Sequence, residues 1–143
     1  MAKRRNLPIT DEEHNKALSL LDSKIREYVS AIEQTGLYSR AKIHDMDYDV
    51  CVYFFRDKEH GQIRKNPILH LNGKFINNNI YLVFRYLKGE KPITKSEWDN
   101  LMPVPRHQSN EKWRAFEISS KDDLVKAKEL ANEAIKTFDR VYY

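Results

Sequence analysis

The densest group of side chains that could hold a metal ion is the acidic stretch from His44 to Asp49. In an extended segment its alternate aspartates, Asp45, Asp47 and Asp49, would share one face, because side chains alternate along a strand. A calcium loop counted from the first of them needs glycine at its sixth position and glutamate at its twelfth, and neither is present. We therefore interpret the stretch as the solvated entry to a strand, with no bound metal and no cofactor.

The histidines are the next candidates for chemistry, and they are His14, His44, His60, His70 and His107. None is spaced from another as the ligands of a structural zinc are. A metal-independent RNase could use His60, His70 or His107 as acid and base, with a cation on the developing phosphorane charge. Glycine-rich phosphate loops and activated serine, threonine or cysteine patterns are absent from the sequence. We predict a protein that is not an enzyme, with a small RNase-like or toxin-like enzyme as the alternative.

The basic residues are more suggestive, since 25 Lys and Arg against 21 Asp and Glu give a net charge of +4. Many lie where strands are expected to end, so the fold could gather them into a phosphate-binding surface. The predicted nucleic-acid-binding residues are Lys3, Arg4, Arg5, Arg40, Lys42, Lys58, Arg64, Lys65, Arg106 and Lys112. Nearby rings that could stack on exposed bases are Tyr38, Tyr48 and Trp113. The alternative is a scatter of solubilising charges.

Two apolar stretches must form the centre of the fold that positions these groups. Residues 80–87 and 50–55 are almost wholly apolar or aromatic, which indicates strands buried on both faces. Arg85 interrupts the first of them, and we expect it to pair with a carboxylate, to lie at a sheet end or to face a partner. The dipeptide Asn72-Gly73 predicts a hairpin between residues 68–71 and 74–76.

Helices are predicted on either side of these strands. Thr10 opens a helix over residues 11–35, and Gly36 follows it in the place of a left-handed C-cap. Thr94 opens a short helix carrying Trp98, residues 113–118 form a last strand, and Ser120 opens the final helix. We predict one α+β domain over residues 10–143 after a basic lead at 1–9. Its antiparallel sheet has four to five strands, with long N- and C-terminal helices and a short helical insertion before the last strand.

Two helices cover one face of such a sheet, so either the Trp98 insertion or a second copy of the chain must shield the other. We predict a homodimer or partner contact through apolar and aromatic side chains and Arg85. Its candidate residues are Leu18, Leu21, Phe84, Arg85, Tyr86, Trp98 and Phe138.

These expectations together describe a basic, homodimeric accessory protein. It would bind DNA or RNA, a larger effector protein, or both, in a nucleic-acid-processing complex such as a bacterial restriction or CRISPR-type defence system. A purely protein-binding adaptor is a further alternative. The sequence contains no apolar run long enough for a membrane helix, and its single cysteine, Cys51, lies in an apolar strand, so we expect a cytoplasmic protein without a membrane partner.

Overall fold

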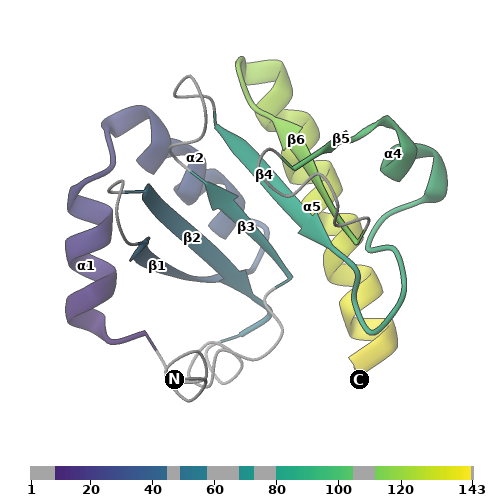
Figure 1. Ribbon diagram of the computed structural model, residues 1–143, viewed down its shortest axis with the longest axis horizontal. Helices are drawn as coiled ribbons and strands as arrows, with labels where there is room; N and C mark the ends of the chain where they lie inside the picture. The colour runs from purple at the N-terminus through teal and green to yellow at the C-terminus, as the bar shows by residue number, and fades with distance from the viewer. Residues whose placement is uncertain (1–8, 45–48, 58–67, 73–79, 105–111, 143) are drawn as a thin grey trace.

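Strands and helices follow one another in the order the sequence predicts, with two additional strands and one additional helix. The computed structural model describes residues 9–44, 49–57, 68–72, 80–104 and 112–142 (Figure 1). The elements are α1 (Asp11–Ser19), α2 (Ser23–Glu33), β1 (Tyr38–His44), β2 (Asp49–Phe55), β3 (Leu69–Asn72), β4 (Tyr81–Arg85), α4 (Lys95–Asn100), β5 (Met102–Pro103), β6 (Trp113–Glu117) and α5 (Lys121–Tyr142).

All six strands pair antiparallel in one sheet, in the order β1-β2-β3-β4-β6-β5. The α+β class is confirmed, and the strand number roughly so. The apolar strands β2 and β4 lie inside the sheet, as their composition requires. The two unpredicted strands, β1 and β5, lie at the edges, where few side chains need to be apolar. The predicted strand 74–76 and the Asn72-Gly73 turn fall outside the described residues.

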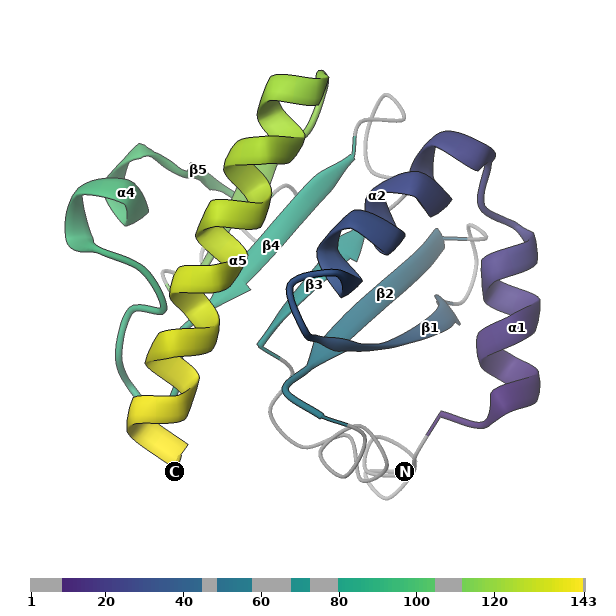
Figure 2. The ribbon, with the colours of Figure 1, turned by 180° about the vertical axis from the view of Figure 1, so that it is seen from behind.

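One face of the sheet carries the main core. Side chains alternate along each strand, so Val52 and Phe54 of β2 share this face with Leu71 of β3 and with Leu82 and Phe84 of β4. Figure 2 shows α2 and α5 crossing this face. We call it the helix face, and the opposite one the second face.

Helix α5 approaches α2 through its alanines. Ala127, Ala131 and Ala134 are fully buried, and their small side chains let the two helices come into contact. Ser120 begins α5 as predicted, because its hydroxyl accepts a hydrogen bond from the backbone N–H of Asp123 at 3.1 Å. No helix in the described part of the chain is both long and apolar enough to cross a bilayer.

The predicted single helix over residues 11–35 is wrong, because two helices occupy that span. The backbone N–H of Ile25 donates to the Asp22 carboxylate at 2.9 Å, so Asp22 serves as the N-cap of α2. Its extended backbone, at φ −73° and ψ 170°, interrupts the helical run after Leu20. Gly36 has the predicted positive φ, +102°, but it lies two residues beyond Gln34, which is the C-cap of α2.

The helix of the Trp98 insertion does not shield the second face, although the residue that follows β5 contributes to it. Trp98 of α4 is 2% exposed and packs with the helix-face core, against Tyr86 at a ring distance of 5.3 Å. A smaller cluster fills the second face around β4. It consists of Tyr81, Val83, Val104 and Ala115, where Val104 comes from the segment after β5. The chain itself therefore buries the middle of β4 on both faces.

Candidate functional site

The second face presents half-buried aromatic and basic side chains where the helix face presents buried aliphatic and phenylalanine side chains. Strand pairing places Arg40 of β1 opposite Tyr53 of β2, and Tyr53 opposite His70 of β3. The next residues in this row are Val83 of β4 and Ala115 of β6. Figure 1 looks onto this face, with α2 and α5 behind the sheet.

Ring contacts make the row continuous, with the rings tilted or edge-on to one another. The ring centroids of Tyr53 and His70 are 5.5 Å apart with the planes at 51°, and those of His70 and Trp113 are 6.1 Å apart with the planes at 76°. His70 and Trp113 belong to strands on either side of β4, so their rings approach each other above the smaller Val83. The guanidinium of Arg85 lies over the other end of the row, 6.0 Å from the Trp113 ring.

The four side chains in contact, Tyr53, His70, Trp113 and Arg85, are all half-buried. A ring that is packed on its neighbours and still partly exposed is held in place and can receive a flat partner. Ring contacts across strands also stabilise the sheet by roughly 0.2–1 kcal/mol per pair, so these side chains have a structural role as well. We call Tyr53, His70, Trp113 and Arg85 the aromatic row.

Positive charge lies at both ends of the aromatic row. Arg40 and Lys42 of β1 are on the second face at one end, and Arg85 is at the other. From β1 to β6 is about 19 Å, four steps of roughly 4.8 Å between neighbouring strands. Among the strand residues whose side chains are described, the acid on this face is Glu117, at the end of β6 away from Trp113.

Arg85 has no carboxylate partner in the described part of the chain. The ion pairs there involve Arg40, Arg56, Lys95, Lys126 and Arg140. The expectation that a carboxylate neutralises Arg85 is therefore not met among these residues. Its cation–π contact with Trp113 leaves the guanidinium N–H groups able to donate to an anion.

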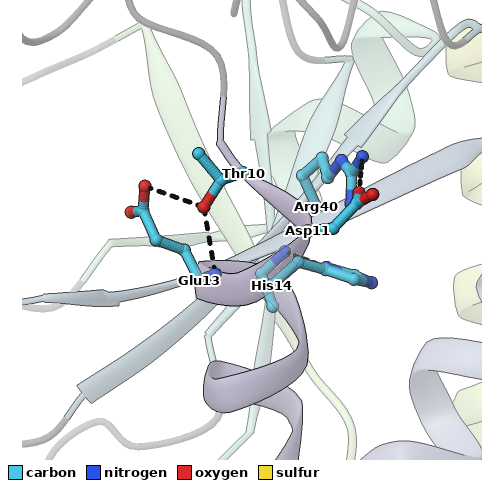
Figure 3. Close-up of polar contacts among 6 residues, drawn as sticks. Thr10, Asp11, Glu13, His14 and Arg40 are labelled. Atoms are coloured by element: carbon cyan, nitrogen blue, oxygen red, sulfur yellow. Dashed lines mark hydrogen bonds and ion pairs between the residues drawn. The ribbon is translucent and has the colours of Figure 1, made fainter.

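The opposite end of the face is held by α1 (Figure 3). Arg40 donates to Asp11 at 2.6 Å, and its side chain is only 14% exposed, so it is the less available of the two β1 cations. The backbone N–H of Ala41 donates to Nδ1 of His14 at 2.8 Å, which satisfies a donor on the outer edge of β1. Burial, and after it the charge of Arg40, lowers the pKa of His14 and keeps this ring nitrogen an acceptor.

The structure describes three of the ten predicted nucleic-acid-binding residues. Arg40 and Lys42 lie together on β1, and Lys112 lies just before β6, close to the Arg85 end of the aromatic row. Those that fall outside the described residues are Lys3, Arg4, Arg5, Lys58, Arg64, Lys65 and Arg106. The same holds for Tyr48 among the predicted stacking rings, for Asp45 and Asp47, and for His60 and His107.

Most of the predicted contact residues are used inside a single chain. Phe84 and Phe138 are fully buried, and Leu21 and Trp98 are 6% and 2% exposed. These four side chains would need to leave the core to reach a second molecule. The remaining three, Leu18, Arg85 and Tyr86, are half-buried.

Tyr53 and His70 were not among the predicted binding residues. The available signal was alternation, because His70 is the polar residue between Leu69 and Leu71 and must point away from the helices. Among the described residues, no three or more histidine, cysteine, aspartate or glutamate side chains gather as they would around a metal ion.

Comparisons with protein-family models, with curated proteins and with solved structures find no match to this chain. The functional argument therefore rests on the geometry of the second face.

Proposed function

We propose that this protein is a non-enzymatic binding protein for single-stranded nucleic acid and that the second face is its binding surface. The observation that carries the proposal is the aromatic row with cations at both ends. Bases stack on protein rings with roughly 1–3 kcal/mol each, whatever the base, and cations neutralise the phosphates.

A single strand fits this surface better than a duplex does. The flat faces of bases are accessible to protein rings only where the bases are unpaired and unstacked. Reading a duplex by its major groove commonly requires a helix presented to the groove, and α2 and α5 lie behind the sheet (Figures 1 and 2). Sheets that carry exposed rings are a recurrent way of binding single-stranded RNA.

The charges indicate a non-specific mode of binding. Lys42 and Arg85 stand at opposite ends of the row, so a strand crossing the sheet would place phosphates near both while its bases lie over Tyr53, His70 and Trp113. Stacking and phosphate contacts do not distinguish sequences strongly. We expect low base specificity and an affinity that falls steeply with salt.

The experiment is a fluorescence-anisotropy titration of single-stranded and duplex oligonucleotides at two salt concentrations. Trp113→Leu removes the ring but keeps an apolar side chain, and it should weaken single-strand binding about tenfold without changing the salt dependence. Lys42→Gln should instead reduce the slope of log affinity against log salt by about 0.7, the value for one lost phosphate contact. Lys121→Gln removes the same charge from an exposed position on α5, away from the second face. It should change neither the single-strand affinity nor its salt dependence.

Three results would contradict the proposal. Absence of single-strand binding at about 50 mM salt would leave the protein-binding adaptor as the better interpretation. Duplex binding that is tighter than single-strand binding and insensitive to Trp113→Leu would remove the second face as the site. Progressive cleavage of bulk RNA, lost in a His70→Ala variant, would establish the RNase alternative.

The homodimer and the role in a larger nucleic-acid-processing complex remain proposals. The large hydrophobic side chains exposed in the described part of the chain are Leu20, Met102 and Val125, on three different elements or connections. Within the described part of the chain, a dimer contact of appreciable apolar area would include half-buried side chains such as Leu18 and Tyr86. Light scattering at micromolar concentration tests it, and a monomeric mass would contradict it.

A further inference from the structure

A small pocket lies where the aromatic row ends. Its volume is about 230 Å³, and its walls come from β4, from the turn that follows β4, from the residue before β6 and from the end of α5. The residues that line it are Arg85, Tyr86, Leu87, Lys88, Gly89, Lys112 and Tyr142. Pockets for drug-sized ligands begin at roughly 300 Å³, so this one suits a smaller group.

Every charged residue among the described residues that line the pocket is positive. Arg85, Lys88 and Lys112 contribute three cations, and no carboxylate is among these lining residues. Glu90, the acid next to Gly89 along the chain, is already engaged by Arg140, whose two terminal nitrogens lie 3.1 Å and 3.4 Å from its carboxylate oxygens. Glu111, which precedes Lys112, lies outside the described residues. Three cations around a small space, with no acid among its described lining residues, favour the binding of an anion.

A tight turn holds one of these cations in place. Leu87 and Glu90 exchange both backbone hydrogen bonds, at 2.8 Å and 3.0 Å, around Lys88 and Gly89. Both central residues have positive φ, 52° for Lys88 and 82° for Gly89, as a type I′ hairpin turn requires. Lysine is an uncommon choice for the first of these positions, where asparagine is preferred.

The ammonium group of Lys88 is also fixed from the other side of the pocket. It lies 5.6 Å from the centroid of the Tyr142 ring and 3.4 Å from the backbone carbonyl oxygen of Val141. The end of α5 thus orders a side chain that would otherwise be mobile. A pre-ordered cation loses less conformational entropy when it binds an anion.

Arg85 belongs both to the aromatic row and to the pocket. We propose that the pocket binds a phosphate monoester, and specifically the terminal phosphate of a strand that lies along the aromatic row. A terminal phosphate carries more charge and one more free oxygen than an internal phosphodiester, which suits a pocket lined by three cations. The assignment to a strand terminus rests on the proposed function, whereas the affinity for a phosphate group does not.

The test compares three short oligonucleotides of one sequence, with a 5′-phosphate, a 3′-phosphate or hydroxyl groups at both ends. One of the phosphorylated strands should bind about tenfold more tightly than the hydroxyl-ended strand. The advantage should disappear in Lys88→Asn, which removes the cation and places at this turn position a residue that tolerates positive φ. It should persist in Lys91→Gln, which removes a neighbouring lysine that lies over Tyr86 and does not line the pocket.

The outcomes separate the two proposals. Equal affinity of all three strands, or an advantage that survives Lys88→Asn, overturns the terminal-phosphate site and leaves the second-face proposal standing. If no strand binds, the pocket is tested separately by titrating the protein with inorganic phosphate and following the NMR signals of the pocket residues. Perturbation of the pocket residues that is lost in Lys88→Asn supports a site for a free phosphate monoester, and no perturbation overturns the pocket as well.

Discussion

The two faces of the sheet are built from the same strands and differ in almost every other respect. On β4, Phe84 points to the helix face and is fully buried, whereas the next residue, Arg85, points to the second face and is half-buried. On β3, Leu69 and Leu71 lie in the helix-face core and His70 lies between them in the aromatic row. Along β3, alternation thus separates residues that stabilise the fold from one that is available for binding. On β4 the separation holds only at the end of the strand, because Tyr81 and Val83 are buried on the second face.

The difference shows where polar residues are tolerated. Helices α2 and α5 exclude water from the helix face, so burying an unpaired cation there would cost several kcal/mol of folding free energy. The second face can place Arg85 over Trp113, where the guanidinium stays hydrated at its edge. The basic residue of β4 therefore lies on the face that α2 and α5 do not cover. Arg114 of β6, opposite Phe84, is on the helix face, where it lies over the Trp98 ring and donates to the backbone carbonyls of Trp98 and Leu101.

The sharpest test of this comparison replaces two neighbours on β4. Phe84→Ala should lower the free energy of unfolding by about 3–5 kcal/mol, because it opens a cavity beneath α5. Arg85→Ala should lower it by no more than about 1 kcal/mol, the value of its contact with Trp113. Urea denaturation measures both changes.

Phe84→Leu provides a milder comparison in case Phe84→Ala does not fold, and it should lie between the two. Oligonucleotide affinity should show the reverse order, with Arg85→Ala weakened and Phe84→Leu unchanged. Equal destabilisation by Arg85→Ala and Phe84→Ala would contradict the separation of the two faces.

Much of the fold could be predicted from local patterns, and most of the site could not. The caps at Thr10, Thr94 and Ser120 are short-range signals, and all three begin helices in the structure. The interruption at Asp22 was missed because the apolar stripe continues through it in the same period. Local sequence does not determine whether the continuous apolar stripe or the N-cap residue Asp22 decides where the helix is interrupted.

The site depends on register, which no local pattern determines. Tyr53, His70 and Trp113 are up to 60 residues apart along the chain, and they meet because β4 lies between β3 and β6. Arg85 was recognised as anomalous from its apolar neighbours, but its position over Trp113 required the pairing of β4 with β6. Three of the basic residues predicted from the sequence lie near the aromatic row: Arg40 and Lys42 within β1, and Lys112 just before β6.

A smaller effect on stability is expected at the outer edge of β1, which borders both faces of the sheet. His14→Ala leaves the half-buried N–H of Ala41 without its acceptor, and the free energy of unfolding should fall by about 1–2 kcal/mol near pH 7. The pKa of His14 is lowered in the folded chain, so as the pH falls below 6.5 the unfolded chain takes up a proton first. Wild-type stability should therefore decrease with acid in this range.

In His14→Ala this contribution to the pH dependence is absent, so the difference between variant and wild type should narrow between pH 7 and pH 5. Urea denaturation at both pH values measures it. If the difference in unfolding free energy stays constant over this range, protonation of His14 does not compete with its hydrogen bond to the N–H of Ala41. Single-strand affinity at pH 7 should change little, because His14 lies beside β1 and outside the aromatic row.

The smallest expected effect lies in the helix layer, between α4 and α5. Burial, and after it the hydrogen bond and charge of Glu97, raises the pKa of Glu133. Its Oε2 atom is buried and has no hydrogen-bond partner among the described residues. The ammonium group of Lys126 lies 3.2 Å from the Glu97 carboxylate, so it forms its ion pair with Glu97 and not with Glu133.

A folded pKa above the unfolded value of 4.5 means that the folded chain binds more protons in the interval between them. Stability is therefore lost as the pH rises through that interval, and the ionised Glu133 opposes folding at pH 7. Glu133→Gln keeps the shape and removes the charge, so the melting temperature at pH 7 should rise by about 1–2 °C, as roughly 0.5 kcal/mol implies for a domain of this size. The gain should vanish near pH 4, where the wild-type carboxyl is protonated.

Glu129→Gln, an exposed neighbour on α5, should show no gain at either pH. A fall in melting temperature for Glu133→Gln at pH 7 would show that the charged carboxylate contributes favourable pairing with Lys126 or Lys136, and that the helix side of the sheet also depends on ionic contacts.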